Sequence, residues 1–105
     1  MIMNATDWNT ALYEKMSDEQ DKFRDWLKGQ PPEEILHHTY EYTVREDIVM
    51  AMEQLELTDA QAQALLDSSS PLADVYRYFE KLETGYMDVI RDSIENRADD
   101  VCRAK

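Results

Sequence analysis

The sequence is poor in the residues that turn or interrupt secondary structure. Its 105 residues include two glycines, Gly29 and Gly85, and three prolines, Pro31, Pro32 and Pro71. A hairpin-rich β protein needs a turn about every 8–12 residues, and such turns depend on glycine and proline. Residues that favour helices dominate instead. The shortage therefore argues against an all-β fold and predicts an all-α protein.

Cysteines, long apolar runs and basic residues are also scarce. The one cysteine, Cys102, excludes an internal disulfide and a thiolate-rich metal site. No run approaches the roughly 18 apolar residues of a membrane-spanning helix, and the N-terminus lacks the pattern of a signal peptide. We therefore expect a cytoplasmic protein. Eleven bases against 23 acids give a net charge of −12, which disfavours direct binding to nucleic acid or to anionic membranes.

Apolar residues recur at helical spacing, and capping residues divide the chain into about five helices. The first helix is expected over about residues 7–28, with Thr6 as its N-cap, and the second from Pro32. Thr43 and Glu46 have the spacing of a capping box. This pattern leaves two alternatives, a helix break at Thr43 or one uninterrupted helix.

The second half of the chain predicts a short helix and a long one. Thr58 and Gln61 form a further capping box, which opens a helix ending near Asp67. Pro71 opens the last helix, whose apolar spacing stays in phase across Gly85. The expectation is one domain over residues 1–105, frayed at 98–105. It should be a compact bundle with long first and last helices, exposing about 6,100 Å². Its core should contain Trp8, Phe23, Trp26, Ile48, Phe79 and Ile90.

The negative charge is concentrated in the middle of the chain. Residues 29–76 hold ten acids and one base, Arg45. One interpretation is a solvated surface that aids solubility. The other is a docking face for a basic protein, or a mimic of nucleic acid, whose duplex carries one charge per about 1.7 Å. The candidate residues of this acidic face are Glu33, Glu34, Glu41, Glu46, Asp47, Glu53, Glu56 and Asp59.

Tyrosines provide an alternative interface. They occur in two pairs spaced two residues apart, so both members of a pair cannot face the same core of a helical bundle. At least one tyrosine of each pair should lie near the surface, where tyrosine suits a protein interface. The residues are Tyr40 with Tyr42, and Tyr76 with Tyr78.

No arrangement in the sequence predicts a reaction. Glu34 and His37 have the Glu-x-x-His spacing of di-iron bundles, but the second such pair is missing. Neither a nucleophile with a base nor a glycine-rich phosphate loop can be assembled from the spacing. We therefore expect no metal, no cofactor and no enzymatic activity.

Four strings resemble a small family carried by gut Firmicutes, often on conjugative or phage-like elements, and known only as a domain of unknown function. They are residues 30–36, 40–48, 71–75 and 84–90, and the resemblance covers most of residues 12–97. It brings no assigned activity but implies a setting of mobile DNA, where small acidic proteins include inhibitors of restriction and CRISPR nucleases. The resulting hypothesis is a non-enzymatic acidic protein that inhibits a nucleic-acid-binding defence protein of the host. The alternative is a structural or regulatory interaction module that docks through exposed tyrosine and methionine.

Overall fold

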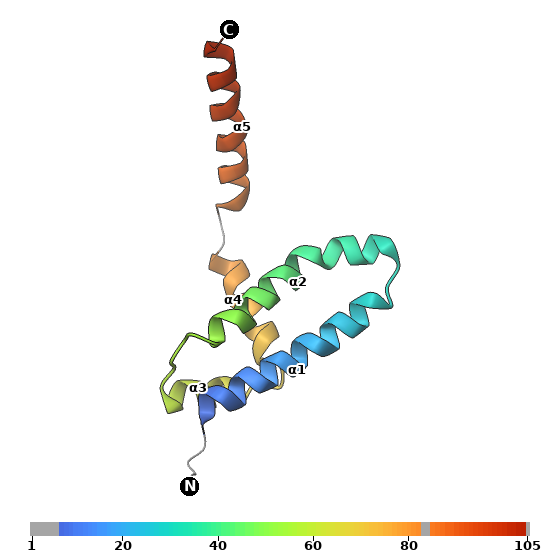
Figure 1. Ribbon diagram of the computed structural model, residues 1–105, viewed down its shortest axis with the longest axis vertical. Coiled ribbons are helices and arrows are strands. Elements are labelled where there is room, and N and C mark those ends of the chain that lie inside the picture. Colours follow the sequence, from blue (N-terminus) through green and yellow to red (C-terminus); the bar gives the residue numbers. More distant parts are fainter. Residues whose placement is uncertain (1–6, 83–84, 105) are drawn as a thin grey trace.

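Four helices form a packed body, and a fifth helix projects from it (Figure 1). The computed structural model describes residues 7–82 and 85–104, of which 83% are helical, and no strand occurs among them. The prediction of an all-α fold with about five helices is confirmed. The helices are α1 (Trp8–Lys28), α2 (Pro32–Met52), α3 (Asp59–Leu66), α4 (Pro71–Leu82) and α5 (Tyr86–Arg103).

Side-chain caps explain where α1 and α3 begin. The carboxylate of Asp7 accepts a hydrogen bond from the backbone N–H of Thr10 at 3.1 Å, while Thr6, the expected cap, lies outside the described residues. At α3 the expected capping box is confirmed. Gln61 Oε1 accepts from the Thr58 N–H at 3.0 Å, and Thr58 Oγ1 accepts from the Gln61 N–H at 3.1 Å. Each cap satisfies N–H groups that have no partner within the helix.

Helix α2 continues through Thr43, so the alternative without a break is the observed one. The capping box expected there does not form, because Glu46 is used elsewhere. Its carboxylate accepts hydrogen bonds from Gln20 Nε2 at 2.9 Å and from Arg24 at 3.3 Å, both on α1. As a result α2 has 21 residues, as many as α1, and the prediction that the first and last helices are the longest is wrong for the last.

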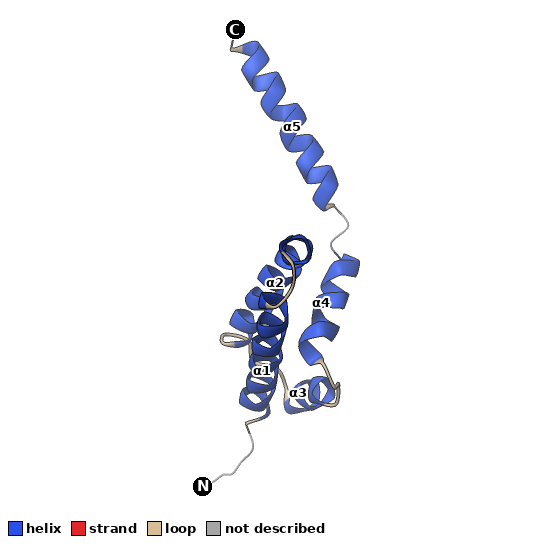
Figure 2. Ribbon diagram, turned by 90° about the vertical axis from the view of Figure 1, so that its right-hand side faces the viewer, coloured by secondary structure: helices blue, strands red, loops and turns tan. Residues whose placement is uncertain are grey.

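The core lies where the α1–α2 hairpin meets α3 and α4, which cover one side of it (Figure 2). Its buried side chains are Leu12, Met16, Met52, Ala62 and Leu72. Of the six large side chains expected in the core, none is fully buried. Trp8 and Ile48 pack at its edge, whereas Trp26 is 47% exposed. The prediction failed for Trp26 because α1 extends beyond the part of the hairpin that α3 and α4 cover.

The fourth and fifth helices are separate, so the prediction of one long last helix is wrong. Helix α4 ends at Leu82 and α5 begins after Gly85, its N-cap. A glycine within a helix lowers the stability of that helix by roughly 1 kcal/mol relative to alanine. At Gly85 no packing offsets this loss, since a Cβ there would have no neighbour within 4 Å. The apolar spacing therefore stays in phase across a point where the helix does not continue.

The projecting helix makes the molecule elongated. Its extents are 69 × 34 × 21 Å and its radius of gyration is 19.0 Å, against about 13 Å for a compact chain of this length. Its accessible surface is 7709 Å², against the expected value of about 6,100 Å². The description as a compact bundle therefore holds for α1–α4 alone. Residues 98–103, where fraying was expected, are helical.

Candidate interaction surfaces

Arg45, the one base of residues 29–76, lies inside the body. It is 9% exposed, and its guanidinium sits 4.3 Å from the ring centroid of Phe23. One terminal nitrogen lies 2.7 Å from Glu41, and the other lies 4.0 Å from Glu19 of α1. Arg45 also lies 5.9 Å from the ring centroid of Tyr76 on α4. This arginine therefore joins three helices and contributes little positive charge to the surface.

Two acids of the expected acidic face are part of internal contacts. Glu41 is occupied by Arg45 and also lies 3.2 Å from a ring nitrogen of His38. Glu46 binds Gln20 and Arg24 across the α1–α2 contact. Both carboxylates therefore help to hold the helices together.

The remaining candidate acids lie at the surface but not on one face. Among the described residues, no hydrogen bond or ion pair occupies the side chains of Glu33, Asp47 and Glu56. Glu53 accepts a hydrogen bond from the Tyr13 hydroxyl at 3.3 Å. Glu34 lies 3.7 Å from His38, and Asp59 is exposed in the first turn of α3. With 3.6 residues per turn, the acids of α2 point to several sides of that helix.

The expected division of the tyrosine pairs is confirmed. Tyr76 is 8% exposed, and burial raises the pKa of its phenol. Its neighbour Tyr78 is 64% exposed and Tyr40 is 42% exposed. Tyr42 is half-buried, and its hydroxyl accepts a hydrogen bond from Arg24 Nε at 3.0 Å, which raises the pKa of the guanidinium. Of the four tyrosines of the expected alternative interface, Tyr40 and Tyr78 are therefore the exposed ones.

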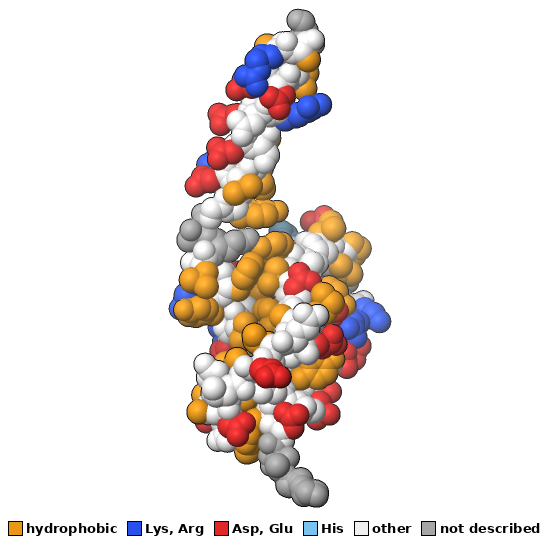
Figure 3. All heavy atoms as spheres, turned by 60° about the vertical axis from the view of Figure 1, so that its left-hand side comes forward, with side chains coloured by type: hydrophobic (Ala, Val, Ile, Leu, Met, Phe, Trp, Pro, Cys, Tyr) orange, Lys and Arg blue, Asp and Glu red, His pale blue; other side chains and the backbone are white. Residues whose placement is uncertain are grey.

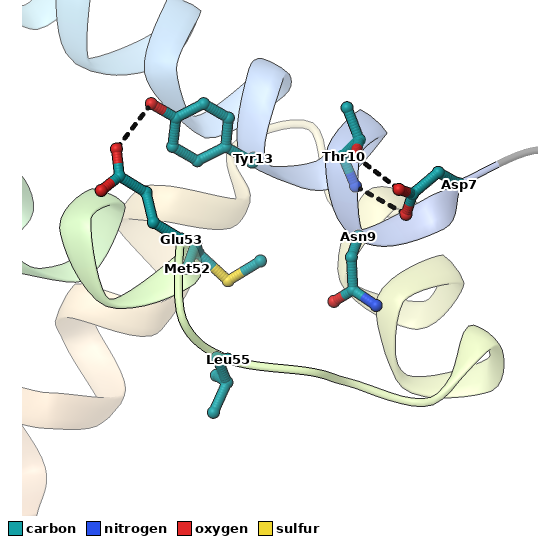
Figure 4. A pocket seen from close by; sticks show the side chains of 7 residues that line it. All are labelled: Asp7, Asn9, Thr10, Tyr13, Met52, Glu53 and Leu55. Atoms are coloured by element: carbon teal, nitrogen blue, oxygen red, sulfur yellow. Dashed lines mark hydrogen bonds between the residues drawn. The ribbon is translucent and has the colours of Figure 1, made fainter.

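Among the hollows of the described residues, two contain candidate site residues. The first, of about 370 Å³, lies between the start of α1 and the end of α2 (Figure 4). Its polar side chains are largely occupied, since Asp7 binds Thr10 and Tyr13 binds Glu53. The charge of Glu53 raises the pKa of the Tyr13 phenol, which makes that hydroxyl a weaker acid. We therefore interpret this hollow as part of the contact between α1 and the end of α2.

The second hollow, of about 340 Å³, lies between α2 and α4. Glu41, Arg45 and Tyr76 line it, together with His38 and Arg77. Both arginines of its wall already have partners, since Arg45 pairs with Glu41 and Arg77 pairs with Asp74. The described residues contain no group of three or more histidine, cysteine or acidic side chains placed to hold a metal ion.

Exposed apolar side chains form the surface that sequence reasoning missed. They gather at the base of α5 and on the part of the body beside it (Figure 3). There the ring of Tyr86 lies 5.8 Å from that of Tyr40. Leu36 is 72% exposed, Met87 56%, and Ile94 63%. The signal was present as an apolar spacing in residues 86–101, but it was assigned to the core because α4 and α5 were expected to be continuous.

A comparison with protein families identifies the chain. The family model described as "Protein of unknown function (DUF3848)" matches residues 8–102. The chain belongs to this family. No curated protein and no solved structure matches it. The match takes in all five helices except the last residue of α5, so α5 is part of the family's own domain. Among the described helices of this DUF3848 protein, none is both long and apolar enough to cross a bilayer.

Proposed function

We propose that this DUF3848 protein is a non-enzymatic binding protein of the cytoplasm, and that the acids of α2 and of the segment leading to α3 dock on a basic protein. The observation that carries the proposal is the burial of Arg45. Residues 29–76 contain ten acids and this single base. With the base inside, the outer surface of the segment presents carboxylates without a positive charge of its own.

The density of these charges indicates the kind of target. Without Glu41 and Glu46, which are used in internal contacts, four carboxylates remain at the surface between Glu33 and Glu53, along 20 residues or about 30 Å at 1.5 Å per residue. That is one charge per about 7.5 Å, whereas duplex DNA has one per about 1.7 Å. The surface is thus suited to a basic patch smaller than a whole duplex-binding groove. The finer proposal, motivated by the mobile-DNA setting of the resemblance, is that this patch belongs to a CRISPR or restriction nuclease.

A competition assay tests the proposal. A CRISPR or restriction nuclease is bound to fluorescent duplex DNA, the protein is added, and displacement and cleavage are followed at low and high salt. The protein should displace DNA at low salt and lose this effect at high salt, because screening weakens contacts between exposed charges. The double variant Asp47→Lys, Glu56→Lys should compete roughly tenfold less well, the loss expected from about 1.4 kcal/mol over two exposed contacts.

The matched control changes the same net charge at another place. Asp92→Lys with Asp99→Lys reverses two exposed carboxylates of α5. It should compete as the wild type does. Equal losses in both double variants would show that only overall charge matters, and no competition by the wild type would rule out these nucleases as targets.

A second candidate function, docking through tyrosine and methionine, is supported by the exposed apolar surface at the base of α5. Tyr40, Tyr78 and Met87 are each at least 42% exposed. In this case binding would resist salt, because apolar burial is not screened. Tyr76 takes no part in it, since that ring is buried between α2 and α4.

A further inference from the structure

Helix α5 has an apolar stripe that none of the other described helices covers. Met87, Ile90, Ile94 and Val101 are spaced by three, four and seven residues, which places them on one side of a helix. The other helices pack on each other, whereas α5 meets the body at its base, where the rings of Tyr86 and Tyr40 lie 5.8 Å apart. An isolated helix of this length is marginal in water. The stripe therefore calls for a surface to pack on.

The chain itself contains a surface that matches the stripe. On α2, Glu33, Leu36 and Tyr40 are spaced by three and four residues and share one side of that helix. On α5, Ile90, Ile94 and Arg97 are spaced by four and three. Two helices laid antiparallel would therefore place Ile90 by Tyr40, Ile94 by Leu36, and Arg97 by Glu33.

The charges agree with this register. Arg97 is the basic side chain within the stripe of α5, and Glu33 is the acidic one on the facing side of α2. Both are exposed, and neither has an ion-pair partner among the described residues. Packing a helix with an unpaired arginine against a purely apolar groove would be costly, whereas here a carboxylate lies in register with it.

We propose that a second copy of the chain covers this surface, with α5 of each copy lying antiparallel on residues 33–40 of the other. The interface is isologous, so each contact occurs twice about a two-fold axis. The two proposals share Glu33, but Asp47 and Glu56, the acids changed to test the acidic docking surface, lie outside the dimer contact. Each proposal can therefore fail without the other.

The area favours two reciprocal contacts. Seven apolar side chains take part: Leu36, Tyr40, Tyr86, Met87, Ile90, Ile94 and Val101. With about 100 Å² exposed on each, roughly half of what a large side chain can bury, one docked helix covers about 700 Å². Two docked helices cover about 1,400 Å², which lies within the 1,200–2,000 Å² of stable interfaces. A single helix folded back onto its own body would bury only half of this area.

Charge reversal at the two ends of the pair tests the proposal. The wild type should sediment as a dimer of about 25 kDa, twice the chain mass. Glu33→Arg alone and Arg97→Glu alone each place like charges together, and each should raise the dimer dissociation constant about tenfold. Mixing the two variants should restore dimers, because in the mixed pair both contacts again join a base to an acid. A fluorophore on Cys102, the only cysteine, marks one variant for this experiment.

The controls separate this arrangement from others. Arg103→Glu makes the same substitution on the opposite side of α5 and should leave the dimer intact. Ile94→Glu should give monomers that retain their helical circular dichroism. A wild type that stays monomeric at high concentration overturns the proposal, and so does a mixture that fails to form dimers. A monomer with a radius of gyration near 13 Å would instead place α5 on its own body.

Discussion

Glu19 of α1 should be among the most important polar side chains for stability, because it fastens α4 to the hairpin. Its two carboxylate oxygens accept hydrogen bonds from the backbone N–H groups of Leu72 at 2.9 Å and Ala73 at 3.0 Å. These groups open α4, where no N–H has a partner within the helix and a negative charge interacts favourably with the helix dipole. The same carboxylate lies 4.0 Å from Arg45.

The loss of stability expected when Glu19 is replaced can be estimated from these contacts. Loss of an N-cap costs about 1 kcal/mol, and hydrogen bonds to a charged group contribute about 1.5–3 kcal/mol. The side chain of Glu19 is 19% exposed, so solvent only partly replaces what is removed. Glu19→Ala should therefore lower the free energy of unfolding by about 2–3 kcal/mol, out of the 5–15 kcal/mol of a typical domain. Glu19→Gln keeps one acceptor oxygen and should cost about half as much.

Urea denaturation followed by circular dichroism measures the effect. With a slope of about 1.5 kcal/mol per molar, Glu19→Ala should move the midpoint down by about 1.3–2 M. Asp18→Ala, a change of the same kind at the neighbouring exposed position, should move it by less than about 0.5 M. If the two variants unfolded at the same urea concentration, the cap on α4 would contribute nothing and the reasoning would be refuted.

Two further predictions concern packing and pH. In urea denaturation, Leu12→Ala, at a side chain with no exposure, should lower the free energy of unfolding by about 2–5 kcal/mol. Leu82→Ala, at a side chain that is 66% exposed, should lower it by less than about 1 kcal/mol. The hydrogen bond from Ser68, and then Arg77, lower the pKa of Asp74 below its ordinary value of 3.8. A carboxyl group whose pKa is lowered by folding stabilises the fold while it is ionised, and this contribution is lost as the pH falls through the lowered pKa. The melting temperatures of the wild type and Asp74→Ala should therefore differ at pH 7 and converge in acid.

The boundaries of the helices were predictable wherever a local signal set them. The capping box at Thr58 and the proline at position 71 act within one turn, so sequence alone placed α3 and the start of α4. At Thr43 a similar signal was overridden, because Glu46 found partners on α1 that are 22 and 26 residues away. The spacing of residues in the sequence does not show whether a side chain will bind a local or a distant partner.

The candidate surfaces were predictable in composition but not in placement. The concentration of acids in residues 29–76 is a property of the sequence, whereas the inward position of Glu41 depends on where Arg45 lies. The exposed stripe of α5 was missed for a related reason. The spacing of apolar residues shows which side of a helix is apolar, but it does not show whether the same chain or another chain packs against that side.

The burial of Arg45 connects the fold to the proposed function. Taking an arginine out of water is costly, and the nearby carboxylates of Glu41 and Glu19, together with the ring of Phe23, offset that cost. An exposed arginine on α2 would instead neutralise neighbouring carboxylates at the surface. The side chain that joins α1, α2 and α4 is therefore also the one whose position keeps the outside of residues 29–76 acidic, so the stability of the body and the charge of its surface depend on the same residue.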